Sequence, residues 1–241
     1  MAKRRGSGLA GGVWGALMAL AALMPATVAR AAPTSMEFSV LTQEDCKGTA
    51  CAKILLGEGE IERDTYRAFL RAAGKLKPGT ALILNSPGGE VSGAILLGMA
   101  IRGAGFDTLV PSGAICNSAC AYAFLGGVSR VVLNDGRLGV HRSRHQLSNG
   151  DKLPPDVERE VDAEVTQKLK TYVTSMGVSA AMLKVADRIS SNQIRYLTPK
   201  EMASYGVVKG KLHLFGDPAK IRRPPRVWAP DGTTIETRAG P

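Results

Sequence analysis

Apolar and polar positions follow two periods along the chain, and they predict buried strands and amphipathic helices. A continuous apolar run over 81–84, followed by turn residues, predicts a buried strand. Apolar positions spaced three and four residues apart then predict a helix over 91–102 that carries on one face Val91, Ile95, Leu96 and Met99. The same spacing predicts an amphipathic helix over 64–73. The pattern therefore predicts an α/β fold in which helices cover a sheet.

A longer helix is predicted to begin at Pro154-Pro155 and to end near Met176. It carries apolar residues at near-heptad spacing, namely Val157, Val161, Val165, Leu169 and Val173. Two interpretations stay open. The helix covers the core of its own subunit, or it meets a second subunit.

Gly88 and Gly89 directly follow the strand predicted over 81–84. Glycines let the backbone turn sharply and direct N–H groups outward. A strand, a glycine turn and a helix together form a backbone cradle for a phosphate or for an oxyanion. A Pro-Gly-Gly sequence on its own is more typical of an ordinary turn between a strand and a helix.

Ser118 lies among small residues at the start of a helix predicted over 119–125. Its hydroxyl is either a nucleophile that a base must activate, or a simple helix cap. His141 follows two predicted strands, over 130–133 and 138–140. It is a candidate base, although a histidine at a strand end is more often a surface or core residue. The combination indicates a serine hydrolase site, because donors, nucleophile and base occur in working order.

The chain resembles the proteolytic subunit of the Clp protease in three motifs and in their order. These are Asn85-Ser86-Pro87-Gly88-Gly89, the loop that carries Ser118, and Gly139-Val140-His141. More broadly they resemble the Clp/crotonase superfamily, which includes signal peptide peptidase A. The segments 55–61 and 196–208 are similar to the family's first strand and closing segment, so the resemblance covers about 53 to 209. It implies a single-domain spiral of ββα units.

Carried over by motif position, the resemblance implies that Ser118 is the nucleophile and His141 the base. It also implies that Gly89 and Ala119 supply the amides of the oxyanion hole, with Gly88 holding the turn. No cofactor or metal is implied. The substrate is expected to be a peptide or protein, and a homo-oligomer stays open.

One position departs from the family. The proteases carry an aspartate just before the closing aromatic-leucine pair, and here that position is Ile194. Asp187 and Asn192 are the nearby polar candidates for orienting the histidine, and a Ser–His dyad is the alternative. His145 is a second candidate base. The peptidase A branch uses a lysine, but neither Lys184 nor Lys200 lies in a matching motif.

Residues 1–31 have the features of a secretory signal peptide. Lys3-Arg4-Arg5 is followed by an uncharged stretch that reaches Ala29, with small residues at the cleavage positions Ala29-Arg30-Ala31. We therefore expect a periplasmic or secreted protein with no stable membrane span after cleavage. The alternative is a membrane anchor formed by the uncleaved segment.

Four cysteines fit an exported protein. Cys46 and Cys51 bracket a short loop near the mature N-terminus that a disulfide between them can close, and Cys116 and Cys120 flank Ser118. Cys116 and Cys120 either form a disulfide, which would be a redox-sensitive clamp at the site, or remain two buried free thiols. Pairing of either residue with Cys46 or Cys51 is also allowed. Without paired Cys-x-x-Cys spacing or a histidine cluster, a metal site is not expected.

The formal net charge is +10, and +6 remains once Lys3, Arg4, Arg5 and Arg30 leave with the signal peptide. Much of the excess lies in a basic, proline-rich tail over 216–241, for which we expect irregular structure. Between the signal peptide and this tail, we expect an N-terminal segment over 32–52 and the Clp/crotonase-like domain over 53–215. The sequence has no pattern of interleaved aromatic and basic residues, so we do not expect it to bind nucleic acid.

Two classes of function follow. The first is an exported serine peptidase. The second is a catalytically weak or inactive binding or scaffold protein of the same fold. Acyl-CoA chemistry, the third and weaker option, fits an exported protein poorly.

Overall fold

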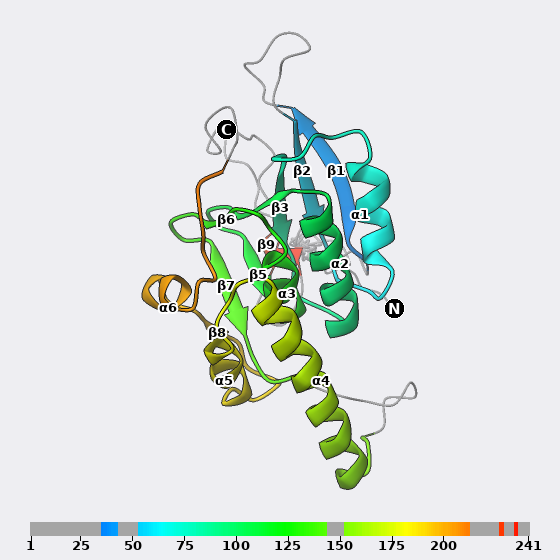
Figure 1. Cartoon of the computed structure of the whole chain (residues 1–241), viewed down its shortest axis with the longest axis vertical. Coiled ribbons are helices and arrows are strands. Elements are labelled where there is room, and N and C mark those ends of the chain that lie inside the picture. Colours follow the sequence, from blue (N-terminus) through cyan, green and yellow to red (C-terminus); the bar gives the residue numbers. More distant parts are fainter. Residues whose placement is uncertain (1–34, 43–52, 144–151, 213–226, 229–233, 236–241) are drawn as a thin grey trace, which may run out of the picture.

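The computed structural model describes residues 35–42, 53–143, 152–212, 227–228 and 234–235 (Figure 1). The predicted signal peptide, the loop with Cys46 and Cys51, and His145 lie outside the described residues. Within the segment 216–241, which we expected to be irregular, strand β9 (Val227–Trp228) pairs antiparallel with β10 (Thr234–Ile235). No helix in the described ranges has both the length and the apolar content that a membrane crossing requires.

A five-stranded sheet forms the first layer, in the order β1-β2-β3-β4-β6. Its strands are β1 (Glu37–Thr42), β2 (Lys53–Glu58), β3 (Ala81–Asn85), β4 (Asp107–Val110) and β6 (Arg130–Val132). The pairs after β1 are parallel, and the register places Leu56 opposite Ile83 and Ile83 opposite Leu109. Every residue of β3 is buried, which explains its uninterrupted apolar run.

A second, smaller sheet contains β5 (Ile115–Asn117), β7 (Arg137–Val140) and β8 (Arg195–Tyr196). Strands β5 and β7 are parallel, and β8 runs antiparallel to β7. Two isolated parallel bridges, Ser86 with Cys116 and Ile61 with Gly89, extend this second layer to the segments that follow β3 and β2. We call each strand of the large sheet, together with the second-layer segment after it, one pass of the chain. Four successive passes therefore each contribute first to the large sheet and then to the second layer.

A helix follows each of the first three passes: α1 (Thr65–Ala73), α2 (Val91–Gly103) and α3 (Ala119–Phe124). After the fourth pass come α4 (Pro155–Ser175), α5 (Ala181–Asp187) and α6 (Pro199–Ser204). Strand, second-layer segment and helix thus recur in one order (Figure 1). This recurrence is the α/β spiral of ββα units that we predicted, and the fold class is confirmed.

The buried face of α2 differs from the predicted one. The face toward the core consists largely of small residues, namely Gly93, Ala94, Leu97, Gly98 and Ile101. On the face we predicted, Val91 and Ile95 are half-buried against the core, whereas Met99 is 56% exposed and Leu96 is 38% exposed. The reason is close packing. A Cβ at Gly98 would collide with the hydroxyl of Tyr172 on α4, so only glycine lets the two helices approach.

Helix α4 packs on the core only through its C-terminal part. Leu169, Tyr172 and Val173 are buried, whereas Val157 near the start is 38% exposed. In Figure 1 the first turns of α4 extend beyond the sheets. The interpretation that the helix covers its own subunit is confirmed for this C-terminal part, and a contact of the first turns with a second subunit stays a prediction.

Arg130 on β6 fixes the closing segment to the rest of the domain. Its side chain is 1% exposed. It donates hydrogen bonds of 2.8 Å to the carbonyls of Val207 and Gly206. Three further bonds of 3.2 Å reach the carbonyls of Leu125, Gly127 and Met176. Burial, together with the nearby charge of Arg102, lowers the pKa of Arg130 to about 10, so the group stays charged at neutral pH.

Candidate active site

Ser118 lies at the sharp turn between β5 and α3. Its backbone has φ 53° and ψ −121°, a left-handed conformation that non-glycine residues rarely adopt. Its N–H donates a 2.8 Å hydrogen bond to the carbonyl of Gly139, and its own carbonyl accepts one of 3.0 Å from Ala121. Among described residues its hydroxyl makes no capping bond to α3. The helix-cap interpretation therefore loses its support, and the half-buried hydroxyl is left for chemistry.

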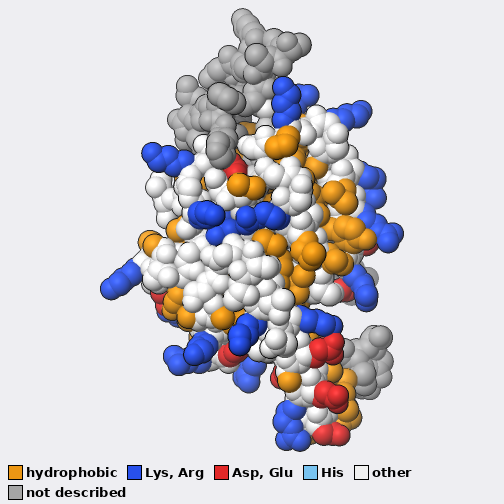
Figure 2. Space-filling view, in the orientation of Figure 1, with side chains coloured by type: hydrophobic (Ala, Val, Ile, Leu, Met, Phe, Trp, Pro, Cys, Tyr) orange, Lys and Arg blue, Asp and Glu red, His pale blue; other side chains and the backbone are white. Residues whose placement is uncertain are grey.

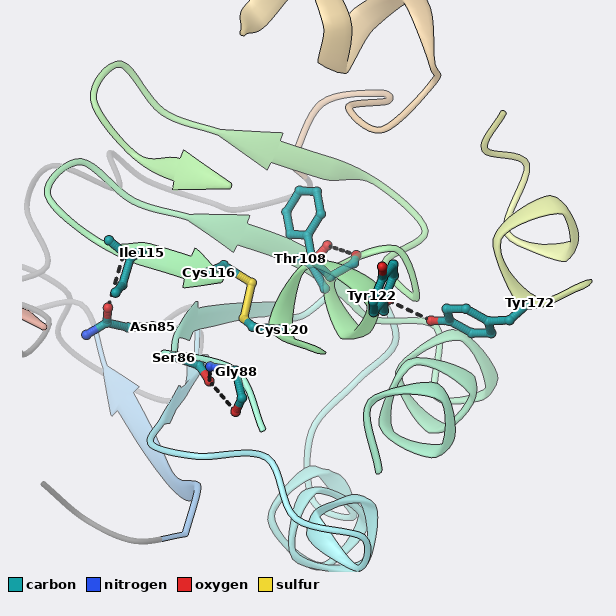
Figure 3. The surroundings of a disulfide bond; sticks show 10 residues. Asn85, Ser86, Gly88, Thr108, Ile115, Cys116, Cys120, Tyr122 and Tyr172 are labelled. Carbon is teal, nitrogen blue, oxygen red and sulfur yellow. Dashed lines mark hydrogen bonds between the residues drawn. A yellow bond between two sulfur atoms is a disulfide. The ribbon is translucent and has the colours of Figure 1, made fainter. Parts of the chain in front are cut away.

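A disulfide brackets this turn, joining Cys116 at the middle of β5 to Cys120 in the first turn of α3 (Figure 3). Their Cα atoms are 5.0 Å apart, and both residues are fully buried. The prediction of a bridge between these two cysteines is confirmed. The alternatives of two free buried thiols and of pairing with Cys46 or Cys51 are wrong for this pair.

The glycine turn packs directly against Ser118. Gly88 and Gly89 have φ of 119° and 135°, which only glycine adopts readily. The N–H of Gly88 donates to Ser86 Oγ at 3.1 Å (Figure 3). A Cβ at Gly88 would lie 2.8 Å from Ser118 Cβ and 3.3 Å from the backbone nitrogen of Ala119. Gly88 is therefore in close contact with the serine turn, and its supporting role stays a prediction.

Two backbone N–H groups remain available beside the serine. Gly89 is exposed at the surface of the turn, and Ala119 is the first residue of α3. Within the described part of the chain, neither N–H has a protein acceptor. The first N–H groups of a helix have no intrahelical partner and attract negative charge. The turn and the helix start thus offer donors for an oxyanion, and both were candidates from the sequence.

His141 follows directly on β7, in the strand next to β5. The register pairs Asn117 of β5 with Gly139 of β7. Ser118 directly follows Asn117 and His141 lies two residues after Gly139, so both come from the ends of adjacent strands. His141 is half-buried and lines a cavity of about 190 Å³. The parallel pairing therefore brings the nucleophile and base candidates, which are distant in sequence, to one edge of the second sheet.

Asp187, at the last position of α5, lines the same cavity as His141. The segment after it is tied to the histidine strand, because the N–H of Arg142 donates a 3.0 Å bond to the carbonyl of Ile189. Partial desolvation in the cavity raises the pKa of Asp187, and the charge of Arg142 opposes the rise. Asn192, the other candidate, is exposed and does not line the cavity.

Asp162 on α4 is a second carboxylate of this cavity, and sequence reasoning missed it. It contributes to the raised pKa of Asp187, because two like charges disfavour each other. Tyr122 of α3 forms another wall, and burial raises the pKa of its phenol, so this group stays neutral. Apolar walls come from Val165, Leu169 and Leu183. The cavity therefore combines two carboxylates, a histidine and an arginine with apolar walls over part of its surface.

Ile194 occupies the position where the resembling proteases carry their aspartate. Its side chain packs beside β7, since a Cβ at Gly139 would collide with Ile194 Cγ2. An isoleucine neither ionises nor accepts a hydrogen bond, so the carboxylate nearest to His141 must come from elsewhere. Among described residues, no group of three or more His, Cys, Asp or Glu side chains is placed to hold a metal ion.

On the face drawn in Figure 2, apolar side chains gather mainly over α1 and α2, and smaller groups lie elsewhere among lysines and arginines. The large apolar side chains that are exposed include Leu96 and Met99 of α2 and Val157 of α4. The Ser118 turn itself is built from small residues, so it adds little to this apolar area.

No protein-family model matches the sequence, and no curated protein matches it either. Among solved structures, the chain is similar to a mutant of ClpP1 from Listeria monocytogenes. The two share 18% sequence identity with a TM-score of 0.48, and the match covers 64% of this chain and 86% of that one. At this identity the likeness concerns the fold alone, so the chemistry is inferred from the residues described above.

Proposed function

We propose that the chain is an exported serine hydrolase that acts on peptide or protein substrates. The observation that carries the proposal is the strained turn at Ser118, which is packed against Gly88 and hydrogen-bonded to the strand that ends at His141. A non-glycine residue in a left-handed turn between a strand and a helix is a costly conformation, and such strain concentrates at functional sites. The same turn geometry presents a nucleophilic serine in other hydrolases.

In the proposed reaction, His141 removes the proton from Ser118 Oγ as the oxygen attacks the acyl carbon. The negative charge on the carbonyl oxygen is stabilised by the N–H groups of Gly89 and Ala119. His141 then gives the proton to the leaving amine. Water, activated by the same histidine, hydrolyses the acyl-enzyme and restores the serine.

We assign the orienting role to Asp187. It shares a cavity with His141, and its segment is bonded to the histidine strand through Arg142 and Ile189. A carboxylate beside the imidazole fixes its tautomer and stabilises the imidazolium that forms during the reaction. The third member of the site is then supplied by α5 in place of the position that Ile194 occupies.

We place the protein in the periplasm or outside the cell. The charged N-terminal residues followed by an uncharged stretch over 1–31 support export. The Cys116–Cys120 disulfide also supports it, because such bonds persist in oxidising compartments. N-terminal sequencing of the protein from its native host should begin at Ala32 or within a few residues. A cytosolic protein that begins at Met1 or Ala2 would contradict this placement.

The test of the function is labelling with a fluorophosphonate probe, which reacts only with an activated serine. Wild-type protein should form one covalent adduct at Ser118, and Ser118→Ala and His141→Ala should each abolish it, because loss of either member typically removes a factor on the order of 10⁴ or more. Both variants should keep the wild-type thermal midpoint, because the two side chains are only half-buried. Folded wild-type protein that gives no adduct and cleaves no peptide or ester would refute the proposal.

A catalytically weak binding protein of the same fold is the second candidate, and Ile194 is the observation that favours it. The fluorophosphonate experiment separates the two functions. A folded wild-type protein that binds peptides without forming an adduct would favour the binding protein.

A further inference from the structure

The Cys116–Cys120 disulfide spans Ser118, the strained residue of the candidate site. Cys116 is in β5, whose backbone is bonded to the glycine-turn segment on one side and to β7 on the other. Cys120 is in the first turn of α3, directly after Ala119. The bridge therefore ties the strand end to the helix start across Ser118, within a segment of five residues (Figure 3).

A left-handed φ at a non-glycine residue persists only where its surroundings determine it strongly. At Ser118 the surroundings are the hydrogen bond from its N–H to Gly139, the contact with Gly88 and the disulfide. The hydrogen bond to Gly139 acts from the β7 side of β5, and the contact with Gly88 acts from the side of the glycine turn. The disulfide, with its Cα–Cα distance of 5.0 Å, fixes the distance between the residues on either side.

We propose that Cys116 and Cys120 are positioning residues, whose disulfide holds Ser118 and the N–H of Ala119 in the reactive arrangement. The inference rests on the proposed function and goes beyond it, because it makes the reactivity of the serine depend on an oxidised pair. Reduction by a small dithiol breaks the Sγ–Sγ bond. Each cysteine becomes a thiol with one added proton, and the dithiol closes to a cyclic disulfide.

Without the bridge, the turn is free to relax from its left-handed conformation. The Ser118 hydroxyl and the Ala119 N–H then no longer keep their relative positions. Relaxation of this strained residue leaves roughly one molecule in ten, or fewer, in the reactive form. The rate of probe labelling should then fall by on the order of 10-fold to 100-fold, while the affinity of the initial complex changes little.

The experiment compares oxidised protein with protein refolded in the dithiol, because both cysteines are fully buried and the folded bond is shielded. The background is C46A/C51A, so that only Cys116 and Cys120 respond to the reductant. The control is C46A/C51A/C116A/C120A, whose labelling should be slow and unaffected by the dithiol. Reoxidation of the reduced protein should restore the fast rate, a reversal that a misfolded product would not show.

A second readout does not depend on catalysis. Hydrogen exchange at the Ser118 amide, which is bonded to Gly139, should accelerate about tenfold or more on reduction, while amides of β3 remain protected. If oxidised protein is never labelled but this exchange still accelerates, the proposed function fails and the positioning of the backbone stands. If reduced protein, with two free thiols shown by mass spectrometry, is labelled and exchanges like the oxidised form, the inference is wrong.

Discussion

The backbone N–H of Ser118 donates a hydrogen bond of 2.8 Å to the carbonyl oxygen of Gly139, two residues before His141. The candidate nucleophile is thus attached to the histidine strand through main-chain atoms. Side-chain substitutions at either residue leave this bond in place. Loss of reactivity in Ser118→Ala or His141→Ala would consequently report on the chemistry rather than on a displaced backbone.

Gly88→Ala tests the contact between the glycine turn and the serine. The new Cβ would lie 2.8 Å from both Asn117 O and Ser118 Cβ, at a φ of 119° that alanine adopts poorly. We expect the free energy of unfolding to fall by about 2–4 kcal/mol, measured by urea denaturation. Probe labelling should slow by at least about tenfold, because Ser118 must shift.

Gly113→Ala is the matched control. Gly113 also has a positive φ, 76°, but nothing lies within 4 Å of its hypothetical Cβ. Its substitution should cost only the backbone penalty of about 1–2 kcal/mol and leave labelling unchanged. Equal effects of the two variants would show that the contact at Gly88 does not position the serine.

Asp187→Asn tests the orienting group of the histidine. An amide does not stabilise the imidazolium, so kcat/KM or the labelling rate should fall by on the order of 10²–10⁴. The thermal midpoint should stay close to that of the wild type, because Asp187 is largely exposed. Because the pKa of Asp187 is raised, wild-type activity should fall as the pH drops through a range above that of an ordinary aspartate.

Asp162→Asn is the control for this carboxylate, since Asp162 lines the same cavity from α4. Removal of its negative charge lowers the pKa of Asp187, and the acid limb of the activity profile should move to lower pH. The rate at neutral pH should change less than about threefold. A large loss in Asp162→Asn with none in Asp187→Asn would exchange the two roles, and no loss in either would indicate a Ser–His dyad.

Glu201 predicts a dependence of stability on acid pH. Hydrogen bonds from Arg195 at 2.6 Å and from the N–H of Thr198 at 2.9 Å lower the pKa of Glu201 from 4.5 to about 2. A lowered folded-state pKa stabilises the protein above pH 4.5, and this contribution disappears as the pH falls toward 2. Urea midpoints of wild type and Glu201→Gln should therefore differ at about pH 6 and converge near pH 2.

The control for Glu201 is Glu164→Gln. Glu164 forms an ion pair with Lys168 on the exposed surface of α4, and this pair also lowers its pKa. Solvent screens such a pair, so its substitution should change the urea midpoint little at any pH. If Glu201→Gln behaved in the same way, the negative charge of Glu201 would contribute nothing to stability, since a glutamine can still accept the bond from the Thr198 N–H.

Arg130→Met should destabilise the fold by at least about 3 kcal/mol in urea denaturation. The methionine fills most of the space but leaves buried carbonyls without donors, including those of Met176 and Val207. Arg102→Met is the matched control, because Arg102 donates to the carbonyls of the same loop, 125–127. It is only half-buried, so water can replace its bonds and the cost should be about 1 kcal/mol.

Elements with a strong hydrophobic period could be predicted closely. The helix expected over 91–102 is Val91–Gly103, and the one expected over 119–125 is Ala119–Phe124. Strand β1 was missed because it is a partly exposed edge strand with no clear period, and α5 because it has only seven residues. The buried face of α2 was predicted only in part, with Val91 and Ile95 packed against the core, because glycine and alanine hardly contribute to a hydrophobic pattern.

The parts of the candidate site that lie in local motifs could also be named from the sequence. Ser118, His141 and the glycine turn each follow a strand, and parallel pairing brings strand ends together. That Ser118, and not another residue, is reactive stays a prediction. Asp187 could only be one of several candidates, and Asp162 carried no signal, since both reach the cavity from helices whose packing no local pattern specifies.

The carbonyls that receive the Arg130 guanidinium are separated widely along the chain, up to 77 residues from it. As the polypeptide is synthesised from its N-terminus, β6 is complete long before Met176 and Val207 exist. A chain interrupted before residue 176 would hold a cation in an apolar interior with only part of its acceptors. We therefore expect the native packing of the sheets to wait for the closing segment, so that this domain folds late and in an all-or-none manner.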